Sequence, residues 1–442
     1  MMQTIPLFTK DRTLHNFLRD VNPAFSDAQL SNAARICQGL VSGLVHKSIY
    51  SIAESLLESR DQSSLNRFLT KSDWGCEVEQ MDVNRALLMQ SYRQTAMTSK
   101  GVICIDDTLL EKSGKKMDLV GEHFDHCTFR MKQGLSLVSM NYCDNGKNYN
   151  FFKKIYVRKK YLLERNEIDQ FKTKIELACQ MITNLIDTVP SLSEIQPYFT
   201  FDSWFLAKDV TALLENHGFK YVSRAKSNRV VKGLDMSLKE YAASVLRPSD
   251  FVCRIFENGE KNDTAYFYSA ILPISNMGDV KVVFIKPEKK GEVSCFLVSN
   301  DVRLSSEEIA EKYSLRWGIE TDYKFSKQEL GLSDFHLRKK RGILRYLTLC
   351  LLSSTFLEYY RLMGAFGRCF GRDADLSTKG REARAYRHLE FERFLLWLDE
   401  QFSSGKSVAD LLYYFREDSL RTVRGIRFVC QSTRLSLKCG AC

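Results

Sequence analysis

The alternation of apolar and polar positions divides the chain into three segments. Apolar residues recur at three- and four-residue steps over residues 33–57 and again over 83–89, which is the spacing of helices that bury one face. We therefore expect a helical N-terminal region over residues 1–95. Residues 96–340 alternate between short apolar runs and helical spacing, and residues 341–442 are again mostly helical in pattern.

The middle segment contains short apolar runs that end at acidic residues. Residues 102–105 form one such run and are followed by Asp106, and residues 198–201 form another and are followed by Asp202. Runs of this length between polar residues predict buried strands. A third strand is expected over residues 219–224.

The remaining pattern predicts a hairpin, several helices and a β-rich insertion. The hairpin spans residues 135–157 and turns at an Asn-Gly pair, which is a strong hairpin signal. Helices are expected over residues 163–187 and 305–330, and the second opens with a capping-box spacing. Residues 225–300 are rich in strands. The elements together predict a mixed α/β fold with an inserted β region, followed by an amphipathic helix over 388–402 that packs against the body.

The net charge of the chain suggests what kind of molecule it binds. The chain has 64 Lys and Arg against 54 Asp and Glu, and a net charge of +10 favours a polyanion such as DNA. One basic cluster comprises Lys153, Lys154, Arg158, Lys159 and Lys160. A second comprises Arg338, Lys339, Lys340, Arg341 and Arg345. Either cluster alone is also typical of a solvated surface, but two clusters flanking candidate acids favour a phosphate-backbone track.

Cysteine usage and hydropathy predict a cytoplasmic protein. The 13 cysteines are not spaced as in a disulfide framework, and an odd number cannot all pair within the chain. Both features favour reduced thiols. No run of apolar residues is long enough for a membrane span, and the N-terminus lacks the blocks of a signal peptide. Zinc at Cys439 and Cys442, or at His123 and His126, is an alternative, although neither pair has further ligands at a closing spacing.

Asp106, Asp202 and Glu320 are the candidate catalytic residues. Open α/β sheets place their sites at the carboxyl ends of strands, where both aspartates are expected. An aspartate at a strand end also serves as a cap or turn residue, and a glutamate within a helix is often only solvated. The three acids therefore need further support.

That support comes from the residues around Glu320. Tyr313, Arg316 and Lys327 share its expected helix, and at 100° per residue the four fall within about 60° of one another. One face thus presents a phenol, a guanidinium, a carboxylate and an ammonium. An amphipathic surface helix would also have a polar face.

These residue types suit phosphoryl transfer on DNA. Three carboxylates can hold two Mg²⁺ ions about 4 Å apart, with Mn²⁺ as a possible substitute, to activate the attacking oxygen and stabilise the leaving one. Arg316 would bind phosphate through its guanidinium fork and Lys327 as a point charge.

With the spacing Tyr313-x2-Arg316-x3-Glu320-x6-Lys327, the sequence resembles the YREK group of bacterial insertion-sequence transposases. Four further segments agree with that family in order and spacing: Ile105-Asp106-Asp107-Thr108, Phe201-Asp202-Ser203-Trp204-Phe205, residues 221–228 and residues 296–301. The resemblance covers about residues 65–340. The YREK block is specific, whereas the aspartate segments are weak singly and strong in this order.

The resemblance implies a DDE transposase with a ribonuclease-H-like catalytic domain over residues 96–340. Asp106, Asp202 and Glu320 would bind metal, with Asp107 as an alternative to Asp106. The implied DNA-binding residues are Tyr313, Arg316, Lys327, Arg338, Lys339, Lys340 and Arg341. The enzyme would cleave double-stranded DNA at the inverted repeats of an element and join the ends to target DNA, as a homodimer at the bacterial nucleoid.

Other regions and other functions stay open at this point. Residues 1–95 would bind the element ends, and residues 341–442 would serve dimerisation or DNA contact by analogy. A domesticated DNA-binding protein of the same fold is one alternative. A metal-dependent nuclease that cleaves without joining is another.

Overall fold

The computed structural model describes residues 11–56, 62–114, 116–125, 128–258, 261–371 and 375–412. The strands are β1 (Val102–Glu111), β2 (Gly121–Asp125), β3 (Arg130–Cys143), β4 (Asn148–Tyr156), β5 (Tyr198–Phe201), β6 (Tyr221–Arg224), β7 (Val230–Val231), β8 (Met236–Ser237), β9 (Val252–Asn258), β10 (Lys261–Ile274), β11 (Gly278–Lys286) and β12 (Cys295–Ser299). The helices are α1 (Arg12–Val21), α2 (Asp27–Val41), α3 (Ile49–Glu54), α4 (Gln62–Thr70), α5 (Val78–Gln90), α6 (Lys159–Leu163), α7 (Lys174–Thr188), α8 (Leu192–Ile195), α9 (Lys208–Asn216), α10 (Leu238–Ser244), α11 (Ser306–Ser314), α12 (Trp317–Gln328), α13 (Lys340–Leu362), α14 (Gly367–Phe370) and α15 (Lys379–Ser403). Two 3-10 turns are η1 (Ile168–Gln170) and η2 (Pro248–Asp250).

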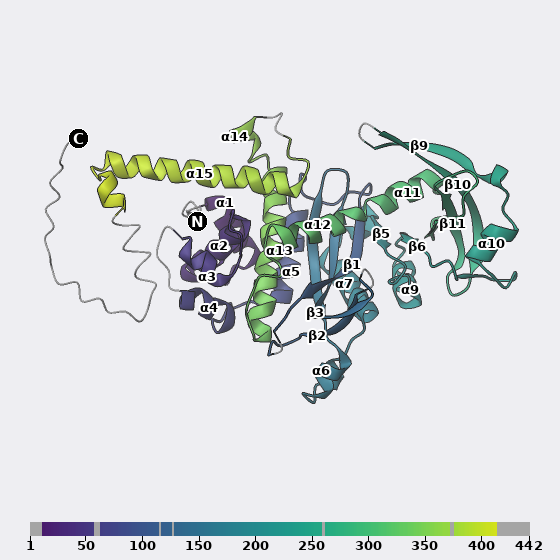
Figure 1. Cartoon of the computed structure of the whole chain (residues 1–442), viewed down its shortest axis with the longest axis horizontal. Helices are drawn as coiled ribbons and strands as arrows, with labels where there is room; N and C mark the ends of the chain where they lie inside the picture. The colour runs from purple at the N-terminus through teal and green to yellow at the C-terminus, as the bar shows by residue number, and fades with distance from the viewer. Residues whose placement is uncertain are drawn as a thin grey trace, which may run out of the picture.

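A mixed sheet forms the centre of the molecule (Figure 1). Its strands lie in the order β2-β3-β1-β5-β6-β12-β11-β10-β7-β8, with β4 beside β3 and β9 beside β10. β1, β5 and β6 are parallel, whereas β3 runs antiparallel to both β1 and β4. Mixed directions with helices on the faces confirm the predicted α/β, ribonuclease-H-like fold class, and the β-rich insertion extends the same sheet.

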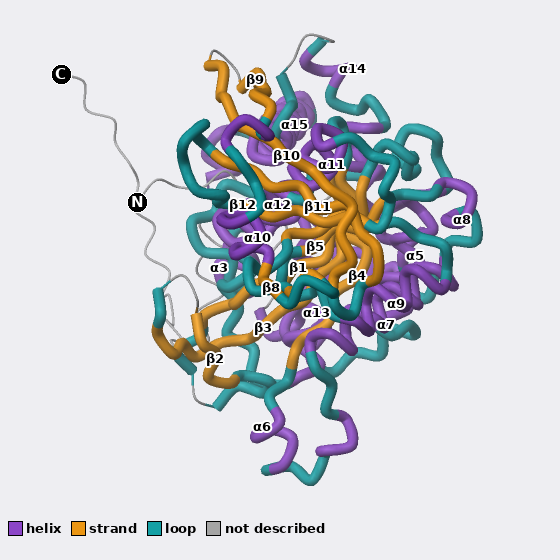
Figure 2. The backbone as a smooth tube through the Cα atoms, turned by 90° about the vertical axis from the view of Figure 1, so that its right-hand side faces the viewer, coloured by secondary structure: helices purple, strands orange, loops and turns teal. Residues whose placement is uncertain are grey.

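The two faces of the sheet have separate cores. Ile103 and Ile105 of β1 lie in the core shared with α5, α7 and α9. The alternate residues, Val102 and Cys104, pack against Ile319 of α12. This follows from the strand geometry, because successive side chains point to opposite faces. Figure 2 shows α5, α7 and α9 gathered on one side of the strands.

The N-terminal helices and the C-terminal helices form one further core. Helices α1 to α4 lie to one side of the sheet, and α13 stands between them and the strands (Figure 1). Apolar residues of α1, α2, α4 and α13 pack in a single buried cluster. Within it, Trp74 stacks on Phe68 with ring centroids 4.8 Å apart. Tyr386 of α15 donates to Asp11, which caps α1, at 2.6 Å.

The hairpin is confirmed, since β3 and β4 join at a turn in which Asp144 N donates to Lys147 O at 2.9 Å. The helix expected over 163–187 begins later, at Lys174. Thr173 caps it through a capping box with Glu176, which is a stronger start signal than any earlier residue offers.

Residues 388–402 pack against the body only over their first part. Leu389 is buried and Arg393 lies 3.1 Å from Asp11, whereas Leu395 and Leu396 are 47% and 65% exposed. Figure 1 shows the helix running outward from its start beside α13. The apolar spacing predicted the helix correctly but did not predict which face has a partner.

Two further findings concern the described part of the chain. The nine cysteines placed there are all free thiols. None of the helices described is long and apolar enough to cross a membrane.

Candidate active site

Asp106 and Asp202 are neighbours on adjacent parallel strands. Ile105 of β1 lies opposite Phe201 of β5, so the next residue of each strand is an aspartate at the same height of the sheet. The expectation that Asp106 follows a strand end is wrong, because β1 continues to Glu111 through its pairing with β3. It is β5 that ends here. Asp202 then accepts hydrogen bonds from the backbone of Trp204 at 2.9 Å and Phe205 at 3.2 Å.

Strand alternation separates Asp106 from Asp107. Asp106 lies on the face of β1 that α12 covers, where Tyr323 donates from Oη to its carbonyl oxygen at 2.9 Å. Asp107 lies on the other face, where Lys174 of α7 pairs with its carboxylate at 2.7 Å. Of the two adjacent acids, Asp106 is therefore the one beside the helix that carries Glu320.

A glycine lets α12 approach the sheet closely. A Cβ at Gly318 would lie 2.6 Å from Cys143 Sγ at the end of β3. The carbonyl of Gly318 also accepts a hydrogen bond from Asn148 Nδ2 at 2.6 Å. With Ile319 and Tyr323 packed on Val102, this contact seats the first turn of α12 against the strands.

The single helix expected over 305–330 is divided into α11 and α12, so Tyr313 and Glu320 do not share one regular helix. The chain tightens between them through hydrogen bonds of the i to i+3 type. Arg316 N donates to Tyr313 O at 3.1 Å, and Gly318 N donates to Leu315 O at 3.0 Å. Tyr313 still lies near the site, because its ring centroid is 5.4 Å from the Arg316 guanidinium.

Arg316 bridges two of the three candidate acids. Its Nη1 lies 3.1 Å from Asp106 Oδ2, and its Nη2 pairs with Glu320 Oε1. Burial raises the pKa of Asp106 to about 7; Arg316 opposes that rise, and the neighbouring charge of Asp202 adds to it. Arg316 Nε is buried and has no hydrogen-bond partner among the described residues. The guanidinium thus has a donor left for a further acceptor.

Lys327 completes the side of α12 that faces β1. Its Nζ donates to Thr108 Oγ1 at 2.6 Å. Thr108 is two residues after Asp106 and therefore on the same face of β1. The structure brings Asp106, Asp202, Arg316, Glu320 and Lys327 to one face of the sheet, over β1 and the end of β5.

The second basic cluster is exposed except for one member. Arg338, Lys339, Lys340 and Arg341 are exposed at the start of α13. Cations are unfavourable near a helix N-terminus, so helix stability does not account for them. Arg345 is instead buried, with its guanidinium 4.3 Å from the Trp74 ring centroid and Nη1 2.7 Å from Ser72 O. A cavity of about 460 Å³ joins Arg338 to the end of β1.

The first basic cluster is partly internal, and only Lys159 and Lys160 of its five members are exposed. Lys153 is buried and pairs with Asp82 of α5 at 2.9 Å. Lys154 lies 3.7 Å from Glu79 on the same helix. These lysines of β4 face α5, whose acids neutralise them.

The donor chemistry of the site fits a hard divalent cation. Carboxylate oxygens are the ligands that Mg²⁺ and Mn²⁺ prefer, and a cation already lies between Asp106 and Glu320. That cation is Arg316, and no three His, Cys, Asp or Glu side chains in the described ranges are grouped as metal ligands.

The alternative zinc sites receive no support from the described residues. Among these residues, no group of three His, Cys, Asp or Glu side chains that includes His123 is placed to hold a metal ion. His126, Cys439 and Cys442 lie outside the described residues.

Comparison with known proteins agrees with this geometry. The family model described as DDE superfamily endonuclease matches residues 20–247, and the model described as Transposase DDE domain matches residues 166–356. A curated relative is the probable transposase for insertion sequence element IS701 of Microchaete diplosiphon. It is 24% identical over 304 residues, which cover 68% of this chain and 74% of the relative.

The chain belongs to the DDE superfamily of endonucleases, since that match covers more than half of its length. Within the superfamily it is a DDE transposase of the insertion-sequence type, which means an enzyme that binds DNA, cleaves it and transfers strands with a divalent metal.

Proposed function

We propose that Asp106, Asp202 and Glu320 are the catalytic acids and that they hold two Mg²⁺ ions. The observation that carries this assignment is the position of Arg316, a cation held between Asp106 and Glu320 on the face of the sheet where Asp202 also lies. When bound, the metals would activate the attacking oxygen and stabilise the leaving oxygen in each phosphoryl transfer.

Arg316, Lys327 and Tyr313 would then hold the scissile strand. Once released from Asp106, the Arg316 guanidinium can bind a phosphate through two parallel hydrogen bonds. Lys327 adds a point charge beside Thr108, and the Tyr313 ring supports the guanidinium. These side chains orient the phosphate for attack. On this basis we place the chain in the YREK group.

The DNA track would continue from these acids to the basic residues 338–341. The backbone would run along β1 toward Glu111, where a cavity joins the end of the strand to Arg338. We assign the catalytic domain to residues 96–340, with the β-rich insertion at about 225–300, and recognition of inverted repeats to residues 1–95. This activity would take place in the bacterial cytoplasm, at the nucleoid.

We also propose that the transposase acts as a homodimer in the synaptic complex. The outer part of α15 has an apolar side made of Phe391, Leu395 and Phe402, and Leu396 lies next to it around the helix; all four are exposed. A contact between two copies of this side would bury it. Mass measurement in solution, with Leu395→Lys and Leu396→Lys together, tests this contact: the variant should be monomeric at concentrations where the wild type is dimeric.

The decisive experiment supplies the purified chain with element-end DNA, Mg²⁺ and a target plasmid. We expect cleavage at the ends and covalent joining to the plasmid. Cleavage without joining would identify a nuclease, and end binding without cleavage would identify a domesticated DNA-binding protein.

A further inference from the structure

A second ionic contact lies on the side of α12 away from β1. Asp322 follows Glu320 by two residues, which turns it about 200° around the helix. It is only 1% exposed. Lys379 Nζ lies 2.5 Å from its Oδ1, and Lys379 is the first residue of α15.

The Asp322 carboxylate is bound from three elements at once. Besides Lys379, Ser354 of α13 donates to Oδ1 at 2.7 Å, and Asn141 of β3 donates to Oδ2 at 3.0 Å. Lys379 also donates to Ser354 at 2.7 Å. Burial opposes both charges, but the pairing holds the pKa of Asp322 below its ordinary value and that of Lys379 above it. The two residues therefore form an ionised pair.

We propose that Lys379 is a positioning residue: through Asp322 it fixes the rotation of α12 and thereby aims Glu320 and Arg316 at Asp106. The contacts are directional and the Asp322 carboxylate is buried, so a rotation of α12 would leave a buried charge without its partners. The inference rests on the role proposed for Glu320. It gives the start of α15 a part in the active site.

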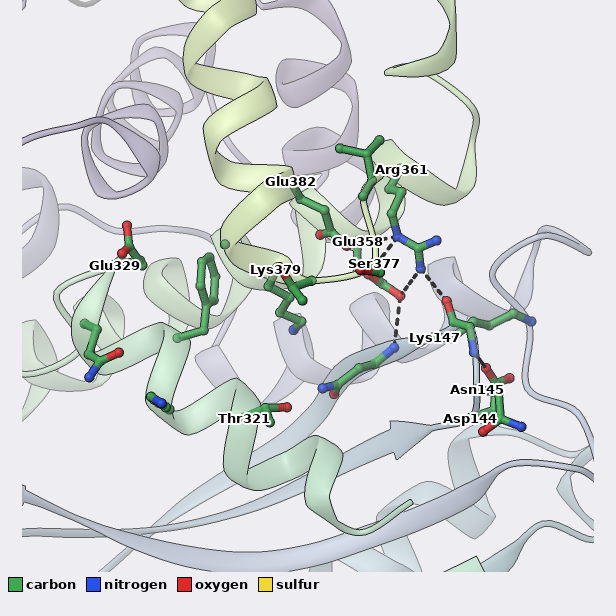
Figure 3. A pocket seen from close by; sticks show the side chains of 18 residues that line it. Asp144, Asn145, Lys147, Thr321, Glu329, Glu358, Arg361, Ser377, Lys379 and Glu382 are labelled. Atoms are coloured by element: carbon green, nitrogen blue, oxygen red, sulfur yellow. Dashed lines mark hydrogen bonds and ion pairs between the residues drawn. The ribbon is translucent and has the colours of Figure 1, made fainter. Parts of the chain in front are cut away.

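Apolar contacts hold α12 on two sides. Ile319 and Tyr323 pack on the sheet, and Phe325 packs in the core that includes α13. On the side away from the sheet a cavity of about 630 Å³ separates α12 from the start of α15, and Thr321, Lys324 and Gln328 line it. Figure 3 shows Thr321 and Lys379 on facing walls of this cavity. Because the cavity leaves room for the helix to tilt, the ion pair at its wall adds a directional contact to the packing of Phe325.

The partner of Asp322 on β3 is itself held in place. Asn150 Nδ2 donates to Asn141 Oδ1 at 2.9 Å, and Arg85 of α5 donates to Asn150 Oδ1 at 2.8 Å. The amide that meets Asp322 has one orientation, because both of its ends are engaged. Lys379 thus holds α12 where Asp322 contacts Asn141, a side chain whose orientation is itself fixed by hydrogen bonds.

Fluorine NMR of the full chain labelled with 5-fluorotryptophan tests the proposal without DNA or metal. The four tryptophans lie in different regions, and Trp317, the first residue of α12, is 64% exposed. Lys379→Met should shift or broaden the Trp317 signal and leave that of Trp74 unchanged. Trp317→Phe assigns the signal.

The matched control breaks another ion pair of α15. Arg393 lies 3.1 Å from Asp11, the residue that caps α1, so Arg393→Met should leave the Trp317 signal in place. In cleavage of bound element ends, Lys379→Met should be slower by roughly ten- to a hundredfold, as for a misplaced catalytic group. Its affinity for the ends should match that of Arg393→Met.

Two further variants make the result decisive. Asp322→Asn keeps the shape and the hydrogen bond from Ser354, so it is used where Lys379→Met does not fold, and it should also move the Trp317 signal. Lys379→Arg should restore cleavage in part. A Trp317 signal in Asp322→Asn that coincides with the wild type would overturn the proposal, even with the catalytic acids confirmed. Cleavage by a Glu320→Ala variant would instead refute the proposed function and leave the Trp317 result standing.

Discussion

Helix α12 carries charged residues on two sides, and solvent reaches only one of them. Toward β1, the side chains of Arg316 and Glu320 are 13% and 32% exposed and contact each other. Toward α13 and α15, the side chain of Asp322 is 1% exposed, and its carboxylate contacts other buried groups. The accessible charges can exchange one partner for a ligand, whereas the buried charge cannot.

The two sides of α12 therefore have different roles: the side toward β1 binds ligands, and the side toward α13 and α15 holds the helix in place. Removing one partner of a buried ion pair typically costs about 3–5 kcal/mol, because the other charge stays unpaired. The pairs toward β1 are partly exposed, so water can reach a charge that loses its partner and the cost is smaller. Substitutions toward β1 should therefore change chemistry with little change in stability, and substitutions toward α15 should change both.

The largest effect is expected from the acids toward β1. Asp106→Ala, Asp202→Ala and Glu320→Ala should each abolish cleavage, since each removes a ligand for the metal, and should leave end binding largely intact. Cleavage of labelled element ends in Mg²⁺ and gel-shift binding are the two measurements. Nicking at close to the wild-type rate by any one variant would remove that residue from the assignment.

An intermediate effect is expected from the cations beside those acids. Arg316→Ala and Lys327→Ala should slow cleavage roughly ten- to a hundredfold, because a charge-assisted contact contributes about 1.5–3 kcal/mol. Glu320→Gln should instead stop cleavage and weaken metal binding. Titrating Mg²⁺ against cleavage rate separates the two outcomes. A metal dependence in Lys327→Ala shifted as far as in Glu320→Gln would show that Lys327 acts through metal.

The local sequence pattern predicted the residues on the accessible side of α12, which faces β1. The strands before Asp106 and Asp202 were predictable, because a short apolar run before an acid marks a buried strand near a site. The hairpin was predictable from its Asn-Gly turn. Glu320 was recognisable through the spacing of its neighbours rather than from any property of its own.

No local sequence pattern predicted the buried contacts of α12 with α13 and α15. Asp322 and Lys379 are 57 residues apart, and nothing near either residue indicates that its charge is buried. The division of the helix at Leu315 and Arg316 was missed for a related reason. Hydrophobic spacing does not show that Gly318 must approach Cys143, which is a tertiary constraint. Burial of Lys153 was missed because its partner Asp82 lies on another element.

A smaller effect, visible mainly in salt dependence, is expected from the exposed residues 338–341. Replacing Arg338, Lys339, Lys340 and Arg341 together with Gln should flatten the plot of log affinity against log salt, by about 0.9 for each phosphate that these side chains neutralise. Arg345→Gln is the contrast: it removes a buried guanidinium and should lower the melting temperature without changing the slope. An unchanged slope in the fourfold variant would make the cluster a solvated surface.

The smallest effect is expected from Asp107, next to the residue with the largest. Its side chain lies on the opposite face of β1, where its pair with Lys174 is about a quarter exposed on the acid side. A pair this accessible contributes about 0–1 kcal/mol, so Asp107→Ala should leave both folding and cleavage within a few-fold of the wild type. Lys174→Met removes the same pair from the other side and should give the same small change. Cleavage rates of the two variants, measured beside Asp106→Ala at saturating Mg²⁺, test the alternation of β1 directly. If Asp107→Ala is inactive while Asp106→Ala still cleaves, the metal ligand is Asp107 and strand β1 presents its other face to α12.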